Sequence, residues 1–423
     1  MQLWVARAGS ALALMLWLVG GCKAPGGGAP APERAAGRAM AASPAAEPPR
    51  VLPFEPGDAT RGKALVAEFQ CNRCHEGTGL AAPKLDQDCV GCHEQIATDR
   101  FQATASKLAK WKPHVMPYRD VPSLTDLGAR LRPAWVRDYL LHPRDLRPGL
   151  AQTMPRLKLS PEQARDIATY LTAGAVPARD VVTPEPTQVA HGRELLSEKG
   201  CIGCHRMTGA GLASPPKNDP GVRTLGLAPD LRFARERAEP AALVRWLLDP
   251  AAVKHDAVMP KLGLSAAEAR DLAAFLSFGE LQPAPRPPAF ERLPPLSRRV
   301  GFDEVNERVF AVTCRHCHTN PDSAGGDGGP GNTGGFGFKP RKIDFSSYRG
   351  IQSGGVDERG ERVSLFAPTR EGLPRLVAAL VARAREAAGQ ESDEVRGMPL
   401  GLPPLSPEQI QLVESWVAQG RPL

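Results

Sequence analysis

The sequence predicts an all-α protein made of three tandem helical modules joined by proline-rich linkers, and two features of the chain carry this prediction. The first is a helix start that occurs three times with nearly the same residues. Ser160, Ser265 and Ser406 are each followed by Pro or Ala and, three residues on, by Gln or Glu. This is the pattern of an N-cap with a capping box. We expect the three helices to end near glycines, at Gly174, Gly279 and Gly420.

The second feature is the distribution of proline. Proline-rich segments at residues 176–188 and 281–300 divide the chain. The domains predicted from these breaks cover residues 58–175, 189–280 and 300–423. Each domain is expected to begin with a leading helix, over residues 58–70, 187–200 and 302–313. No extensive sheet is expected.

Each leading helix runs into the pattern Cys-x-x-Cys-His, and a fourth copy lies inside the first module. The cysteine pairs are Cys71 and Cys74, Cys89 and Cys92, Cys201 and Cys204, and Cys314 and Cys317, followed by His75, His93, His205 and His318. The pattern is the attachment signature of c-type haem, because its two sulfurs reach the porphyrin vinyl groups and its imidazole binds the iron. Paired thiols on zinc or a redox dithiol are the alternatives, but neither requires a His directly after the second Cys. The sequence therefore predicts four covalently bound haem c groups.

The ninth cysteine, Cys22, ends a segment that looks like a signal peptide. Arg7 supplies a positive charge, and Ala11–Val19 form an apolar core shorter than the roughly 20 residues that a membrane span needs. Residues 19–22 resemble a lipoprotein signal-peptidase site. We therefore expect a signal peptide over 1–21, a lipidated Cys22 and a disordered tether over 22–57 that is rich in Ala, Pro and Gly. An ordinary secretory signal and a short membrane helix are the alternatives.

Haem attachment and the signal both place the protein outside the cytoplasm. In the lipoproteins that this segment resembles, Lys23 after the lipidated cysteine favours the periplasmic side of the outer membrane, with the inner membrane and the cell surface as alternatives. The net charge of +7 falls when Arg7 is removed and eight haem propionates are added. Because Lys and Arg form no basic run, a nucleic-acid partner is not expected.

The leading helix, the haem motif and the capped last helix together resemble a class I cytochrome c domain, and this resemblance covers nearly all residues from 58 onward. In that family a proline carbonyl accepts a hydrogen bond from the proximal imidazole. Residues 82–85 (Ala-Pro-Lys-Leu) and 228–231 (Ala-Pro-Asp-Leu) look like the loop that supplies it. The resemblance therefore implies that Pro83 supports His75 and that Pro229 supports His205.

The same family takes its sixth iron ligand from a late Met-Pro. This chain has a Met-Pro shortly before each capped helix, at Met154, Met259 and Met398. The resemblance implies that these methionines are distal ligands, since a thioether binds both redox states of the iron. The alternative is that each methionine fills a gap in the core.

The first module departs from the family in an insertion of about 86–122 that carries the second haem motif. Its distal ligand is expected to be Met116, which begins a fourth Met-Pro, or His114, which would make a bis-His haem. His142 is a further candidate. His316 stands between the cysteines of its own motif, where it is not expected to bind that motif's iron.

The third module departs through a glycine-rich stretch, residues 325–337, followed by Ile343-Asp344-Phe345-Ser346-Ser347-Tyr348. It resembles the extended cytochrome domains of planctomycete proteins, which also have a helix like residues 376–387 before Met-Pro. The glycine-rich stretch is interpreted as a flexible surface insertion, or as a loop that binds a partner.

Four haems on a lipid tether predict a membrane-anchored electron carrier of a periplasmic respiratory chain, with a redox protein as donor and another as acceptor. The first alternative is a dihaem peroxidase-like or sulfur-compound oxidoreductase, in which the haem at His93 would lack a strong sixth ligand. The second is a haem-bearing docking subunit of a larger membrane complex. The sequence therefore favours an electron carrier over an enzyme, with a redox enzyme subunit as the alternative.

Overall fold

The computed structural model describes residues 53–115, 121–148, 150, 153–174, 183–213, 215, 223–285, 288–319, 330–390 and 394–423. The expected signal peptide, Cys22 and nearly all of the expected tether lie outside the described residues. Met116 and the side chain of His114 lie outside them too. The structure is 46% helix with almost no strand, in agreement with the all-α prediction.

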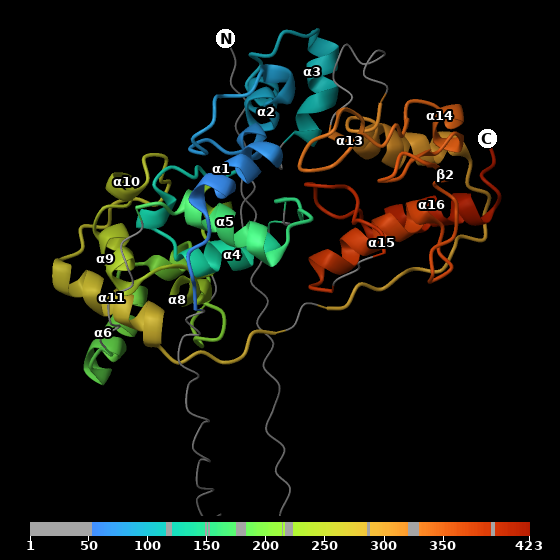
Figure 1. Cartoon of the computed structure of the whole chain (residues 1–423). Helices are drawn as coiled ribbons and strands as arrows, with labels where there is room; N and C mark the ends of the chain where they lie inside the picture. Colours follow the sequence, from blue (N-terminus) through green and yellow to red (C-terminus); the bar gives the residue numbers. More distant parts are fainter. Residues whose placement is uncertain are drawn as a thin grey trace, which may run out of the picture. The chain divides into compact units, whose positions relative to one another are not determined.

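The elements are short and follow one another closely along the chain (Figure 1). The α-helices are α1 Ala59–Glu68, α2 Cys89–Ala97, α3 Ala105–Trp111, α4 Pro133–Leu141, α5 Pro161–Leu171, α6 Pro186–Glu198, α7 Arg223–Gly226, α8 Ala234–Arg237, α9 Pro240–Leu248, α10 Pro250–Val253, α11 Ala266–Phe278, α12 Phe302–Val305, α13 Pro330–Thr333, α14 Tyr348–Gln352, α15 Arg375–Ala387 and α16 Pro407–Ala418. A π-helix, Asn306–Cys314, continues α12. The two strands described, β1 Gly355–Val356 and β2 Arg362–Val363, pair antiparallel with Gly355 opposite Val363.

The three capped helices predicted from the sequence are confirmed as α5, α11 and α16. In each, the serine N-cap accepts a hydrogen bond from the backbone N–H three residues on, and the Gln or Glu side chain there accepts one from the serine N–H. Both bonds satisfy N–H groups that a helix start leaves without an intrahelical partner, and such a cap is worth about 1 kcal/mol. The cap therefore fixes where each helix begins.

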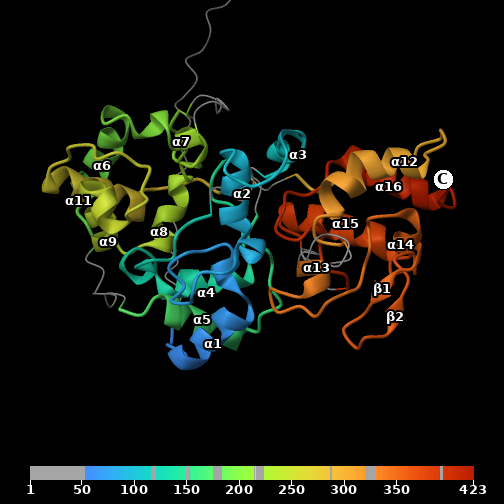
Figure 2. The ribbon, with the colours of Figure 1, turned by 90° about the horizontal axis from the view of Figure 1, so that it is seen from above.

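The leading and capped helices of the first two modules cross at a glycine. In the first module α1 crosses α5, and a side chain at Gly62 would overlap the backbone of Asp166 and Cβ of Tyr170. In the second module α6 crosses α11, and a side chain at Gly192 would overlap Asp271 and Phe275 in the same way. The absence of a Cβ lets the two backbones touch, which brings the haem motif at the end of each leading helix over its module's core. Figure 2 shows α6 beside α11.

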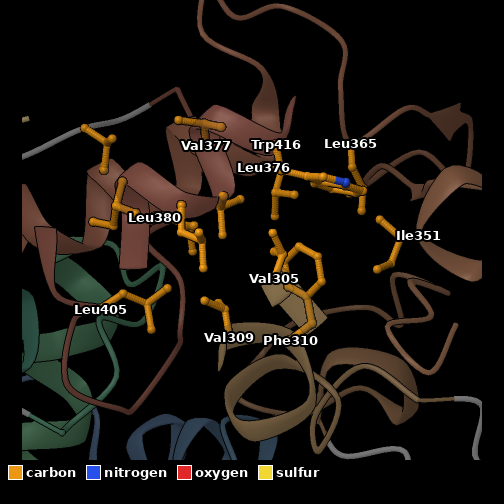
Figure 3. Close-up of a cluster of buried hydrophobic side chains, with 14 of the residues drawn as sticks. Val305, Val309, Phe310, Ile351, Leu365, Leu376, Val377, Leu380, Leu405 and Trp416 are labelled. Atoms are coloured by element: carbon orange, nitrogen blue, oxygen red, sulfur yellow. The ribbon is translucent and has the colours of Figure 1, made fainter. Parts of the chain in front are cut away.

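The third module builds its core around large aromatic side chains, whereas the leading and capped helices of the first two modules meet at a glycine. Its first helix changes to π-helical hydrogen bonding before Cys314, and its core forms around Trp416 of α16 (Figure 3). The Trp416 ring packs edge-to-face against Phe310 at a centroid distance of 5.7 Å. Trp416 and Phe310 are both fully buried. The aromatic position of the last helix is therefore a core position in this module, as the sequence predicts.

Each predicted module has its own buried apolar cluster, and the insertion has a small fourth one of Ile96, Leu108 and Val115. The described residues nevertheless all belong to one unit, Ala46–Leu423. Separate domains thus remain a prediction. In the parts of the chain that the structure describes, no helix combines the length and the apolar character needed to cross a bilayer.

Candidate haem sites

Three of the four Cys-x-x-Cys-His motifs form one tight turn after a leading helix. The backbone N–H of the motif histidine donates to the carbonyl of the first cysteine at 2.9 Å for His75, 2.9 Å for His205 and 3.0 Å for His318. The second motif instead begins α2, where Asp88 caps the helix by accepting from the N–H of Gly91. Either geometry spaces the two sulfurs by one turn, with the imidazole next to them.

Burial raises the pKa of several motif thiols. None of the eight motif cysteines is in a disulfide. Burial raises the pKa of Cys71 to about 11 and that of Cys314 to about 12, and it also raises the pKa of Cys201. A redox dithiol needs a thiolate, which forms where the thiol pKa is lowered. The surroundings of these three thiols therefore disfavour a redox dithiol.

The imidazoles of His75 and His205 are each held by a proline carbonyl. Nδ1 of His75 donates to the carbonyl of Pro122 at 2.8 Å, and Nδ1 of His205 donates to the carbonyl of Pro229 at 2.8 Å. A proton on Nδ1 leaves the lone pair of Nε2 for a metal. Burial lowers the pKa of both histidines, against a smaller opposing effect of the proline bond. Both rings are therefore neutral near pH 7 and can bind iron.

The predicted role of Pro83 is wrong, because the carbonyl of Pro122 accepts the hydrogen bond from His75. The haem-bearing insertion enters the chain between His75 and its supporting proline, so the supporting loop follows the insertion instead of preceding it. The backbone confirms the match: Leu124 N–H donates to the Glu76 carbonyl at 3.0 Å, as Leu231 N–H donates to the Arg206 carbonyl at 2.8 Å. The Pro-x-Leu of residues 122–124 repeats that of 229–231 and is the signal that would have identified it.

The histidines of the other two motifs are also neutral near pH 7; His93 is buried and His318 is partly buried. Burial lowers the pKa of His93 to about 4, with a further lowering by the neighbouring His316 and an opposing effect from a backbone hydrogen bond to Val115. Burial alone lowers the pKa of His318 to about 4. Within the described residues no hydrogen-bond partner lies on Nδ1 of His318. All four motif histidines thus keep a lone pair for a metal at neutral pH.

Two of the three expected distal methionines lie against the cores of their modules. Met154 packs on the first module's cluster and Met259 on the second module's. The sulfur of Met259 also accepts a hydrogen bond from Nε1 of Trp246 at 3.1 Å. The backbone N–H of Met398 donates to the carbonyl of Ala379 in α15 at 2.9 Å. Their role as ligands stays a prediction.

Buried cationic groups between the first and second modules fit the acidic edge of a haem. The Arg237 guanidinium lies over the Trp135 ring at 5.2 Å from its centroid. Nε of Arg237 and Nε1 of Trp135 are buried without a hydrogen-bond partner among the described residues. The pKa of Arg237 is lowered to about 10, mainly by burial, with an opposing effect of Tyr139 and smaller contributions from the charges of Arg130 and Arg144. Two unsatisfied donors in a positive environment suit a carboxylate, which a haem propionate would supply.

The haem motifs also approach one another. The thiol of Cys89, in the second motif, raises the pKa of the Cys74 thiol in the first motif, so the two side chains are neighbours. His255, in the loop before Met259, pairs with Glu76 at 3.2 Å, next to the first motif. The ring centroids of His93 and His316 are 6.3 Å apart, which joins the second motif to the fourth. None of these approaches was predicted from the sequence.

The remaining histidines have ordinary structural surroundings. His142 is exposed and is the C-cap of α4. His191 pairs with Asp271 across the crossing of α6 and α11 at 2.8 Å. In the first module the pair Arg61–Asp166 occupies the corresponding position at the crossing of α1 and α5.

Crossed helices, a cysteine turn and an imidazole held by a carbonyl define a small helical domain for covalently attached haem. Residues 189–278 match the sequence model of the cytochrome c family. This segment is a cytochrome c domain, and it supports a c-type cytochrome with covalently bound haem and a role in electron transfer. No curated protein and no solved structure matches the chain.

Proposed function

We propose that the protein is a four-haem c-type cytochrome that relays electrons outside the cytoplasm. The observation that carries this proposal is the repetition of one site. In all four Cys-x-x-Cys-His motifs the cysteines lie outside any disulfide, and the histidine is buried or partly buried with a pKa that burial lowers. Haem iron supplies a one-electron couple that changes oxidation state without breaking a bond in a substrate.

The contacts between motifs support a relay in preference to four independent carriers. The first motif meets the second through Cys74 and Cys89, and the second meets the fourth through His93 and His316. The second module meets the first motif through His255 and Glu76. Haems attached at these motifs would lie next to one another, so electrons would pass between the modules of the chain.

The proposal includes the expected ligands, anchor and partners. Met154, Met259 and Met398 would complete three iron sites, and His/Met ligation suits a comparatively oxidising respiratory segment. A lipid on Cys22 would hold the protein on the periplasmic side of the outer membrane, with a redox protein as donor and another as acceptor. The 22–57 segment would then act as a tether for three tandem haem domains.

The test counts haem in the purified full-length holoprotein. Pyridine haemochrome absorbance and intact mass should give four haems per chain, and each double variant that replaces one cysteine pair with alanine should lose one. Fewer than four haems in the wild type would overturn the four-haem proposal.

The same sample separates a carrier from an enzyme. A carrier should show four six-coordinate, low-spin haems in electron paramagnetic resonance (EPR) spectra and no turnover of peroxide or sulfur compounds. A high-spin haem together with turnover would establish the enzyme alternative. Co-purification with an integral membrane oxidase or quinol-oxidising complex would establish the docking subunit.

A further inference from the structure

His316 and His93 face each other across the first and third modules, although 223 positions separate them in the sequence. Their ring centroids are 6.3 Å apart, and the ring planes are inclined by 48°. His93 is buried with 8% of its surface exposed, whereas His316 is exposed. His316 thus lies at the surface of its own module, beside the second haem motif.

This separation fits two imidazoles bound to opposite sides of one iron. An imidazole nitrogen binds a first-row metal at about 2 Å, and the ring centre lies roughly 1 Å beyond the nitrogen, so two such rings have centroids about 6 Å apart. Both ring planes contain the nitrogen–iron–nitrogen axis, and each ring can rotate about it. An inclination of 48° is therefore compatible with shared coordination.

The motif of the third module leaves His316 available for another haem. Its own haem takes Cys314, Cys317 and His318, which are the invariant positions of the pattern. No two of the four motifs have the same pair of intervening residues, and only the third module's motif has a histidine there, so attachment does not depend on this position. His318 is partly buried beside Phe345, with centroids 5.8 Å apart, whereas His316 is exposed.

The other side of the His93 imidazole is in contact with its own insertion. The backbone of Val115, which is buried in the small cluster of the insertion, lies beside that imidazole. A distal ligand of this haem has to reach the iron from the side opposite His93.

We propose that His316 is the distal ligand of the haem attached at Cys89 and Cys92, opposite His93. The inference rests on the proposed four-haem function. It makes this haem bis-His, with a lower potential than the Met-ligated haems. It also joins the first and third modules through one iron.

The test compares the wild-type holoprotein with His316→Met by EPR and near-infrared magnetic circular dichroism. The wild type should contain one bis-His low-spin haem per chain. His316→Met should convert that signal to a His/Met signal and raise the potential of one haem, with four haems still attached. His114→Gln and Met116→Leu are the matched controls and should leave the bis-His signal unchanged.

A second variant covers the case in which His316→Met does not accumulate. His316→Gly should lose the low-spin signal of one haem and regain it when imidazole is added. Four haems with an unchanged bis-His signal in either His316 variant, or no bis-His haem in the wild type, would overturn the proposal. A missing haem at Cys89 and Cys92 would instead overturn the four-haem function itself.

Discussion

The first and second modules have cores of the same design, and they differ in the loop that follows the proximal histidine. Both cross a leading helix over a capped helix at a glycine, Gly62 or Gly192, and both hold the proximal imidazole with a proline carbonyl. The first module accepts an insertion with its own haem motif between His75 and Pro122. The comparison teaches that the helix crossing and the proline bond define the haem domain, while the loop between them tolerates large additions.

Removing the distal methionine should have the largest effect on this comparison. Met259→Ala should open the His205 haem to carbon monoxide and lower its potential on the order of 0.1–0.3 V, within the range of about 0.8 V that axial ligands span. Met154→Ala should do the same at the His75 haem if the two modules are equivalent. Redox titration and carbon monoxide difference spectra measure both changes. An unchanged spectrum in either variant would remove that methionine from its site.

The glycine at each helix crossing should tolerate no side chain. Gly192→Ala places a Cβ against the backbone of Asp271, so we expect a loss of about 1–3 kcal/mol or more in the stability of the second module. Gly62→Ala should have the same effect on the first module. Hydrogen exchange measured by mass spectrometry should show faster exchange in α6 and α11, or in α1 and α5, respectively.

Gly226→Ala is the matched control for this pair, because no atom of the described residues lies within 4 Å of a Cβ at Gly226 in α7. Equal protection in Gly192→Ala and Gly226→Ala would show that the crossing is not as close as the structure has it.

The elements were predictable from local rules, since a capping box depends on residues within one turn. The haem motifs were predictable for the same reason, and so was Pro229, which lies in an uninterrupted loop. Pro83 was misassigned because the pattern Ala-Pro-Lys-Leu occurs before the insertion, and only the fold shows which proline faces His75. The contacts of His316 with His93 and of Trp246 with Met259 join residues from separate elements, so no local pattern encodes them.

The indole of Trp246 should raise the redox potential of the second module's haem and of no other haem. Its N–H donates to the sulfur of Met259, which withdraws electron density from that sulfur and favours ferrous iron. Trp246→Phe removes the donor, so we expect the potential of the His205 haem to fall by roughly 20–60 mV, the one-electron equivalent of a hydrogen bond worth about 0.5–1.5 kcal/mol. The potential of the His75 haem should stay constant in the same titration. A fall at both haems would mean that the effect is not local.

The smallest expected difference between the two modules is the pH dependence of the stability of their helix crossings. Asp271 raises the pKa of His191 through a hydrogen bond, so this pair stabilises the second module fully below the unfolded pKa of about 6.5 and less as pH rises through the folded pKa. In the first module Arg61 lowers the pKa of Asp166, so that pair is complete above about pH 4 and is lost only in acid. Between pH 5.5 and pH 8.5, the protection of α6 from hydrogen exchange, corrected for intrinsic rates, should fall while that of α1 stays constant. Because both His191 and Arg61 are about half exposed, solvent keeps the change small.

His191→Arg gives the second module the same kind of charge pair as the first, so it should remove the pH dependence. A pH dependence that persists in this variant would assign it to another group.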